Sequence, residues 1–139
     1  MNKKIILTGD RPTGPLHLGH FVGSIQNRVE MQKNDKVYII IANTQGLTDY
    51  FNNPELLKNN IYQLVSDYIS CGIDHEKTTI FLQSQIPALA ELTIYYMNLV
   101  SLSRLQRNPT IKEQLKHKSF KNNIIALKNH LCTDIFSSY

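Results

Sequence analysis

Three short runs of apolar, largely β-branched residues constrain the fold of this chain more than any other feature. They cover residues 4–8, 37–42 and 78–82, a length that suits buried strands better than helices. Between and after them, apolar residues recur at three- and four-residue steps, which indicates helices. This alternation of strand and helix is typical of a doubly wound α/β protein with a parallel sheet.

Local signals predict where the helices begin and end. The first helix is expected to start near Leu16 and to break at Asn34-Asp35. The second begins at Asn53-Pro54-Glu55, which supplies an N-cap, a first-position proline and an acid in the first turn, and Gly72 is expected to close it. From Pro87 to about Arg107 the pattern is helical but apolar on nearly every side, which indicates burial, for example against a second subunit.

Composition and charge exclude several classes of protein. The chain has 139 residues, of which 42% are hydrophobic and 19% charged, a globular composition. Apolar runs fall short of the ~20 residues that a membrane span needs, and the first run is too short for a signal peptide. Two cysteines exclude a disulfide framework, so we expect a cytoplasmic protein with no membrane association. The net charge is +4, and its basic excess follows Arg104, where it could contact RNA phosphates or form a solvated helix face.

The segment most informative about chemistry is Pro12-Thr13-Gly14-Pro15-Leu16-His17-Leu18-Gly19-His20, between the first run and the first helix. Two histidines three residues apart share one face of a helix start, where N–H groups and the helix dipole favour an anion such as phosphate. Phosphoryl or nucleotidyl transfer needs such positioned donors. Polar residues also follow the other two runs, so we expect a ligand site at the carboxyl ends of the strands. Alternatively, the histidines cap the helix or form half a metal site, but no third ligand is apparent and no metal site is predicted.

Several segments resemble tryptophanyl-tRNA synthetases, a family of class I aminoacyl-tRNA synthetases, and the histidine motif is similar to the family's HIGH signature. The resembling blocks are Leu7–His20, Asn43–Asp49, Phe81–Leu89, Tyr95–Val100 and Arg107–Thr110. The resemblance implies the first half of a Rossmann-like (HUP-type) parallel sheet, followed by apolar and basic helices. It makes residues 1–120 the amino-terminal part of the nucleotide-binding domain and residues 121–139 a divergent tail.

The resemblance also implies a reaction, in which the carboxylate of L-tryptophan attacks the α-phosphorus of ATP, pyrophosphate leaves, and the adenylate passes to tRNA(Trp). It implies Mg²⁺ on the ATP phosphates and a homodimer whose contact is the apolar helix. The residues it assigns are His17 and His20 as catalytic, Arg11, Pro12, Thr13, Gly19 and His20 for ATP, and Leu7 and Gln45 for the amino acid.

Other interpretations stay open beside these assignments. Leu7 could be plain strand core, Gln45 could only satisfy backbone groups of a loop, and the family usually has Asp where this chain has Asn43. Beyond Phe120 the chain departs from the family, Asp134 is a faint echo of its tryptophan-binding Asp, and the KMSKS loop and anticodon-binding domain are not found. We therefore expect the 139 residues alone to be inactive. The alternatives are an inactive truncated remnant or dimerisation module, a tyrosyl-tRNA synthetase, or a small nucleotidyltransferase.

Overall fold

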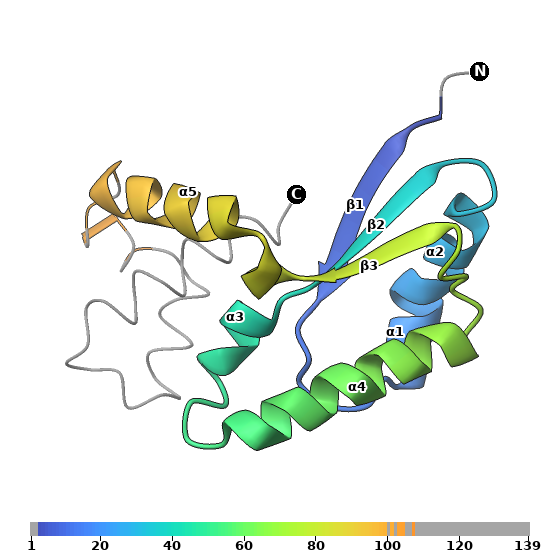
Figure 1. Ribbon diagram of the computed structural model, residues 1–139, viewed down its shortest axis with the longest axis horizontal. Helices are drawn as coiled ribbons and strands as arrows, with labels where there is room; N and C mark the ends of the chain where they lie inside the picture. The colour runs from blue at the N-terminus through green and yellow to red at the C-terminus, as the bar shows by residue number, and fades with distance from the viewer. Residues whose placement is uncertain (1–2, 100, 102, 105–106, 108–139) are drawn as a thin grey trace. The chain divides into compact units, whose positions relative to one another are not determined.

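The computed structural model describes residues 3–99, 101, 103, 104 and 107, which divide between a unit of residues 1–85 and a unit of residues 86–139 (Figure 1). In chain order, the elements are β1 (Ile5–Asp10), α1 (Leu18–His20), η1 (Phe21–Ile25), α2 (Gln26–Met31), β2 (Lys36–Ile41), α3 (Asn43–Leu47), α4 (Pro54–Ser70), β3 (Thr78–Leu82), η2 (Gln83–Gln85) and α5 (Pro87–Leu99). The predicted break at residues 108–110, the basic helix after it and the tail of residues 121–139 lie outside the described residues.

The three predicted strands form one parallel sheet in the order β1-β2-β3. Thr8 lies opposite Ile39 on β2, and Ile39 lies opposite Ile80 on β3. The predicted α/β class is therefore confirmed. The first strand extends two residues beyond its predicted end, because the register continues through Gly9 and Asp10, which pair with β2.

The core lies between one face of this sheet and the helices α2 and α4, which cover the same side of it (Figure 1). Its centre on β2 is Val37, Ile39 and Ile41, all buried. Alternate residues of a strand point to opposite faces, so the other face carries Ile5 and Leu7, which are 74% and 60% exposed. The interpretation of Leu7 as plain strand core is thus wrong, because β1 is buried on one face only.

The helix α4 begins and ends at the predicted residues. Asn53 is its N-cap, and its side chain accepts a hydrogen bond from the N–H of Leu56; Pro54 and Glu55 follow in the first turn. Gly72 lies just beyond the C-terminus with φ of 100°, a left-handed conformation that favours glycine. The signals were decisive here because capping is a local property of the sequence.

The first helical segment differs from the prediction. It begins at Leu18 rather than near Leu16, because His17 adopts an extended conformation (φ −121°, ψ 170°) and serves as the N-cap. The turn from Phe21 to Ile25 is a π-helix, which separates α1 from α2. The segment ends at Gln32, whose side chain is buried. The Gln32 amide N–H donates to the carbonyl of Gly72, and its oxygen accepts from the N–H of Asp74 and the hydroxyl of Thr78.

Two short helical pieces lie where polar residues follow β2 and β3, and no helix is predicted from the sequence at either place. Residues Asn43–Leu47 form α3, and residues Gln83–Gln85 form the 3-10 turn η2. Both lie at the carboxyl ends of their strands, so they build the edge of the sheet where a ligand site was predicted.

The second unit is described mainly by α5, which ends at Leu99 and not near Arg107. Its apolar side chains Ile94, Tyr95 and Leu99 are exposed, so the described residues do not bury this helix on every side as predicted. In the described part of the chain, no helix combines the length and apolar character needed to cross a membrane.

Candidate active site

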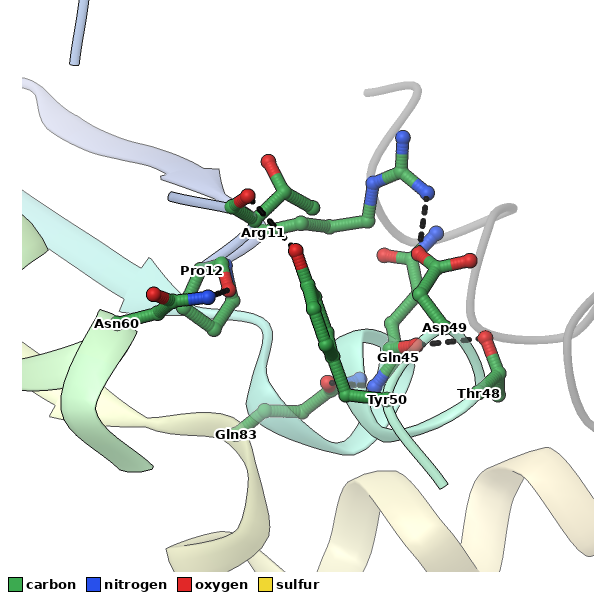
Figure 2. A network of polar contacts seen from close by, with 9 residues as sticks. Arg11, Pro12, Gln45, Thr48, Asp49, Tyr50, Asn60 and Gln83 are labelled. Carbon is green, nitrogen blue, oxygen red and sulfur yellow. Dashed lines mark hydrogen bonds and ion pairs between the residues drawn. The ribbon is translucent and has the colours of Figure 1, made fainter. Parts of the chain in front are cut away.

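The loop between β1 and α1 is held from two sides. The side-chain amide of Asn60 donates to the carbonyl of Pro12 (3.3 Å), and the hydroxyl of Tyr50 donates to the carbonyl of Thr13 (2.8 Å), as Figure 2 shows. Further on, the N–H of Leu16 donates to a carboxylate oxygen of Asp67 on α4 (2.9 Å). Such tethers fix the path of the loop before any ligand arrives, which lowers the entropy cost of binding.

The first residue of this loop, Arg11, has a charged side chain. Its guanidinium forms an ion pair with Asp49 at 3.3 Å, and both side chains keep solvent exposure (Figure 2). An exposed pair of this kind contributes about 0–1 kcal/mol to stability. Arg11 can therefore exchange this partner for a ligand phosphate at small cost, since guanidinium groups match phosphate geometry.

His17 and His20 cap the helix and face each other. The Nδ1 of His17 accepts from the N–H of Gly19 (3.1 Å), the Nδ1 of His20 accepts from the N–H of His17 (3.3 Å), and the ring centroids are 3.9 Å apart. The capping alternative is thus correct as a structural description. It also has a chemical consequence, because a neutral imidazole that accepts at Nδ1 carries its proton at Nε2. Both rings then present an Nε2–H donor that suits a phosphate oxygen.

Two positions of the motif require glycine because of the local geometry. Gly14 has a φ of 140°, a backbone conformation that residues with a Cβ rarely adopt. A Cβ on Gly19 would lie 2.9 Å from the His17 ring, so a side chain there would disturb the histidine contact.

The ends of β2 and β3 are joined by amide side chains. Asn43 and Ser84 bond reciprocally: the Asn43 amide donates to the Ser84 hydroxyl (2.8 Å), and the Ser84 N–H donates to Asn43 Oδ1 (3.0 Å). Asn supplies both donor and acceptor here, which an Asp carboxylate would not. Nearby, Gln45 is buried, and its N–H donates to the side-chain oxygen of Gln83 (3.2 Å; Figure 2).

A buried charged network at the end of β1 was not predicted. The Asp10 carboxylate accepts two hydrogen bonds from Arg28 (2.6 and 3.2 Å) and one from the Tyr68 hydroxyl. Burial tends to raise the pKa of Asp10, but the bonds from Arg28 and Tyr68 outweigh it and hold this pKa below its ordinary value. The available signal was spacing, because Arg28 follows Phe21 and Ile25 at the steps that face the core.

The predicted site residues divide into three groups. One is the continuous segment that contributes Arg11, Pro12, Thr13, His17, Gly19 and His20. Gln45 lies at the same carboxyl edge of the sheet through its bond to Gln83. Leu7 lies on the sheet face away from α2 and α4, where its exposure leaves it open to a ligand. Within the described ranges, no group of three or more metal-binding side chains occurs, and Asp134 lies outside them.

We compared the sequence and the fold of this chain with known proteins. The family model "tRNA synthetases class I (W and Y)" matches residues 1–130. The chain is 56% identical over 128 residues to the tryptophan–tRNA ligase of Lactococcus lactis subsp. lactis (strain IL1403), covering 91% of this chain and 38% of that protein. It is 55% identical over 128 residues to the tryptophan–tRNA ligase of Clostridium longisporum, again covering 91% and 38%. The chain thus spans well under half the length of these relatives.

Solved structures agree with this result. Tryptophanyl-tRNA synthetase from Mycoplasma pneumoniae superimposes with a TM-score of 0.82 at 26% identity, covering 96% of this chain and 40% of that one. The Campylobacter jejuni enzyme, complexed with ADP and tryptophan, gives 0.80 at 26% identity, covering 94% and 40%. A tyrosyl-tRNA synthetase from Archaeoglobus fulgidus, at 0.74 and 16% identity, shares the fold. The chain belongs to the class I tRNA synthetases of the tryptophan and tyrosine type.

Proposed function

We propose that this chain is the amino-terminal, ATP- and tryptophan-binding part of a tryptophan–tRNA ligase, with residues 1–120 contributing to the nucleotide-binding domain. The observation that carries the proposal is the pair of adjacent histidine rings, tilted by 37° with centroids 3.9 Å apart, on the same tethered segment as Arg11, because this segment gathers two imidazoles and a guanidinium. Donors fixed before the reaction are what stabilises charge on a phosphoryl group.

In this proposal His17 and His20 donate to phosphate oxygens of ATP, and Arg11 leaves Asp49 to neutralise phosphate charge. Gly19, which lacks a Cβ, lets the nucleotide approach the backbone closely, and Pro12 and Thr13 contribute the tethered backbone of the loop. The tryptophan carboxylate attacks the α-phosphorus, the bond to the bridging oxygen breaks, and pyrophosphate leaves. The adenylate is then the donor for tRNA(Trp). The main chemical contribution of these residues is positioning and charge compensation.

The amino acid would lie between Leu7 and Gln45. An exposed Leu7 offers apolar surface to an indole, and the Gln45 side chain lies on a helix held rigidly by Gln83. The near relatives named tryptophan–tRNA ligase favour tryptophan over tyrosine, whose synthetase shares only the fold.

Mg²⁺ fits this site as a companion of the nucleotide. Three carboxylates at this loop already have partners: Asp10 pairs with Arg28, Asp49 pairs with Arg11, and Asp67 accepts from the N–H of Leu16. Mg²⁺ commonly binds through substrate phosphates and water with few protein ligands. When bound, it would supply charge neutralisation on the phosphates, and this part of the chain would hold the phosphates themselves.

We further propose a homodimer in the cytoplasm, formed through α5. The exposed Ile94, Tyr95 and Leu99 on this helix support the proposal, because a stable monomer rarely leaves such a row of large apolar side chains in water.

The test has two parts. ATP is titrated into the 139-residue chain with the histidine side chains observed by NMR, and shifts at His17 and His20 are expected. ATP–pyrophosphate exchange is then measured on this chain and on the longest reading frame that contains it. Exchange that requires tryptophan supports the proposal; exchange with tyrosine, or without any amino acid, contradicts it.

The second candidate is a dimerisation module without catalytic activity. It is favoured by the exposed apolar side chains Ile94, Tyr95 and Leu99 of α5. If histidine shifts with ATP are absent while the chain still dimerises, this reading replaces the first.

A further inference from the structure

The network of Asp10, Arg28 and Tyr68, called here the Asp10 clamp, joins three elements at one point. Asp10 is the last residue of β1, Arg28 lies in α2, and Tyr68 lies in α4. Arg28 is 5% exposed and Tyr68 is fully buried, and the Arg28 guanidinium meets both carboxylate oxygens of Asp10 in a bidentate pair. The pair therefore fixes direction as well as distance.

Stability alone does not account for this arrangement. The Arg28 side chain is 6% exposed and that of Asp10 is 24% exposed, so the pair requires desolvation of both charges in part or in full, and well-packed apolar side chains often stabilise a fold as well or better. The surrounding core positions are apolar, including Ile25 and Leu64. A buried pair of this kind is best explained by the geometry that it imposes.

That geometry bears on the histidines. Arg28 and His20 belong to one continuous helical segment, α1–η1–α2, so fixing the Arg28 side chain fixes the rotation of the segment about its axis. At the other end of the clamp, Asp10 immediately precedes Arg11 in the chain. The clamp thus connects both halves of the phosphate-binding loop: the strand that delivers Arg11 and the helix that carries His17 and His20.

We propose that Asp10 is a positioning residue for ATP binding, which acts through Arg28 to hold the two histidines and Arg11 in register for the phosphates. This inference rests on the proposed function. Asp10 itself is not required to touch the nucleotide.

The experiment separates positioning from stability with two variants of the 139-residue chain. Asp10→Asn leaves the Arg28 charge buried without its carboxylate, so it should lose both stability and ATP affinity. The double variant Asp10→Asn/Arg28→Gln removes both charges, so much of the stability should return. Val37→Ala, a core substitution on β2 outside the clamp, provides a control that lowers stability to a similar degree.

Two measurements are made on each variant: ATP affinity from histidine NMR shifts, and amide hydrogen exchange at His17 and Gly19, whose N–H groups form the helix cap. We expect the double variant to bind ATP roughly tenfold more weakly than the unmodified chain and to lose cap protection. Val37→Ala should retain both at conditions where it stays folded.

The opposite pattern overturns the inference. In that pattern, ATP affinity and cap protection change in proportion to global stability in all three variants. The double variant then recovers its ATP affinity and cap protection together with its stability, and Asp10 has a structural role only. The exchange measurement needs no nucleotide. If the unmodified chain fails to bind ATP, the proposed function fails, while loss of cap protection in the double variant would still support the positioning by Asp10.

Discussion

The two roles of His17, cap and phosphate donor, can be separated at the scale of the residue. An asparagine retains a side-chain acceptor for the N–H of Gly19 but lacks the Nε2–H group. We expect His17→Asn to keep the free energy of unfolding within about 0.5 kcal/mol and His17→Ala to lower it by about 1 kcal/mol. ATP affinity, measured by titration, should fall in both. Equal affinity of His17→Asn and the unmodified chain would exclude the donor role.

Acid should destabilise the chain through Asp10. Its pKa is lowered in the folded state, so its carboxylate contributes stability above the unfolded pKa of about 3.9, and this contribution is lost as pH falls through the lower, folded pKa. Urea unfolding between pH 7 and pH 2.5 should show a free energy that declines below about pH 4. Asp10→Asn should flatten this decline, and Glu76→Gln, at an exposed position, serves as the control. If the free energy of unfolding of Asp10→Asn declined with pH as steeply as that of the unmodified chain, Asp10 would not be the cause of the acid sensitivity.

Gly46 lacks a side chain, which allows α3 to pack closely against Leu57 and Pro12. A Cβ on Gly46 would lie 2.9 Å from Leu57 Cδ1 and 3.2 Å from Pro12 Cδ. Gly46→Ala should therefore lower the free energy of unfolding by about 1–3 kcal/mol, the usual effect of overpacking. Gly23→Ala is the control, because its Cβ would meet nothing within 4 Å. Thermal unfolding that shifts equally in both variants would contradict this explanation.

At the scale of elements, Gln32 joins the end of α2 to the connection between α4 and β3. Its amide forms three hydrogen bonds there, and Thr78 is buried beside it. Gln32→Leu leaves buried polar groups without partners and should cost about 2–4 kcal/mol, measured by urea unfolding. Asn27→Leu, at an exposed position of the same helix, should change stability by less than about 0.5 kcal/mol. Similar losses in both would show that the bonds contribute little.

Sequence reasoning found the elements that local signals determine. The three β-branched runs and the Asn53–Gly72 helix are visible because strand patterning and capping depend on neighbours in the chain. The pieces α3 and η2 were missed, since Asn43 and Gln83 find partners, Ser84 and the Gln45 N–H, that become neighbours only once β2 and β3 pair.

The same distinction applies to the candidate site. The histidine motif could be found because its residues are contiguous, whereas Asp10, Arg28 and Tyr68 are far apart in sequence and meet only in the fold. The exposure of Leu7 could not be predicted either. An apolar run does not reveal whether one or both faces of its strand are covered.

At the scale of the whole molecule, the exposed apolar side chains should drive association. Ile94 on α5 is 55% exposed, so Ile94→Lys should leave the free energy of unfolding nearly unchanged while reducing concentration-dependent self-association in sedimentation experiments. Ile6→Ala, on the covered face of β1, should do the reverse and destabilise by about 2 kcal/mol. Self-association that does not change in Ile94→Lys would contradict a dimer contact on α5.

The order of the strands in the sheet, which equals their order in the chain, has a consequence for synthesis on the ribosome. In the described part of the chain, β2 pairs with β1 and β3 pairs with β2, so none of these three strands must insert between two that have already paired. Ile5 and Lys36 can meet once the first helices have emerged, and β3 can add to the growing edge later. A nascent chain can therefore assemble this sheet vectorially, one strand and one helix at a time.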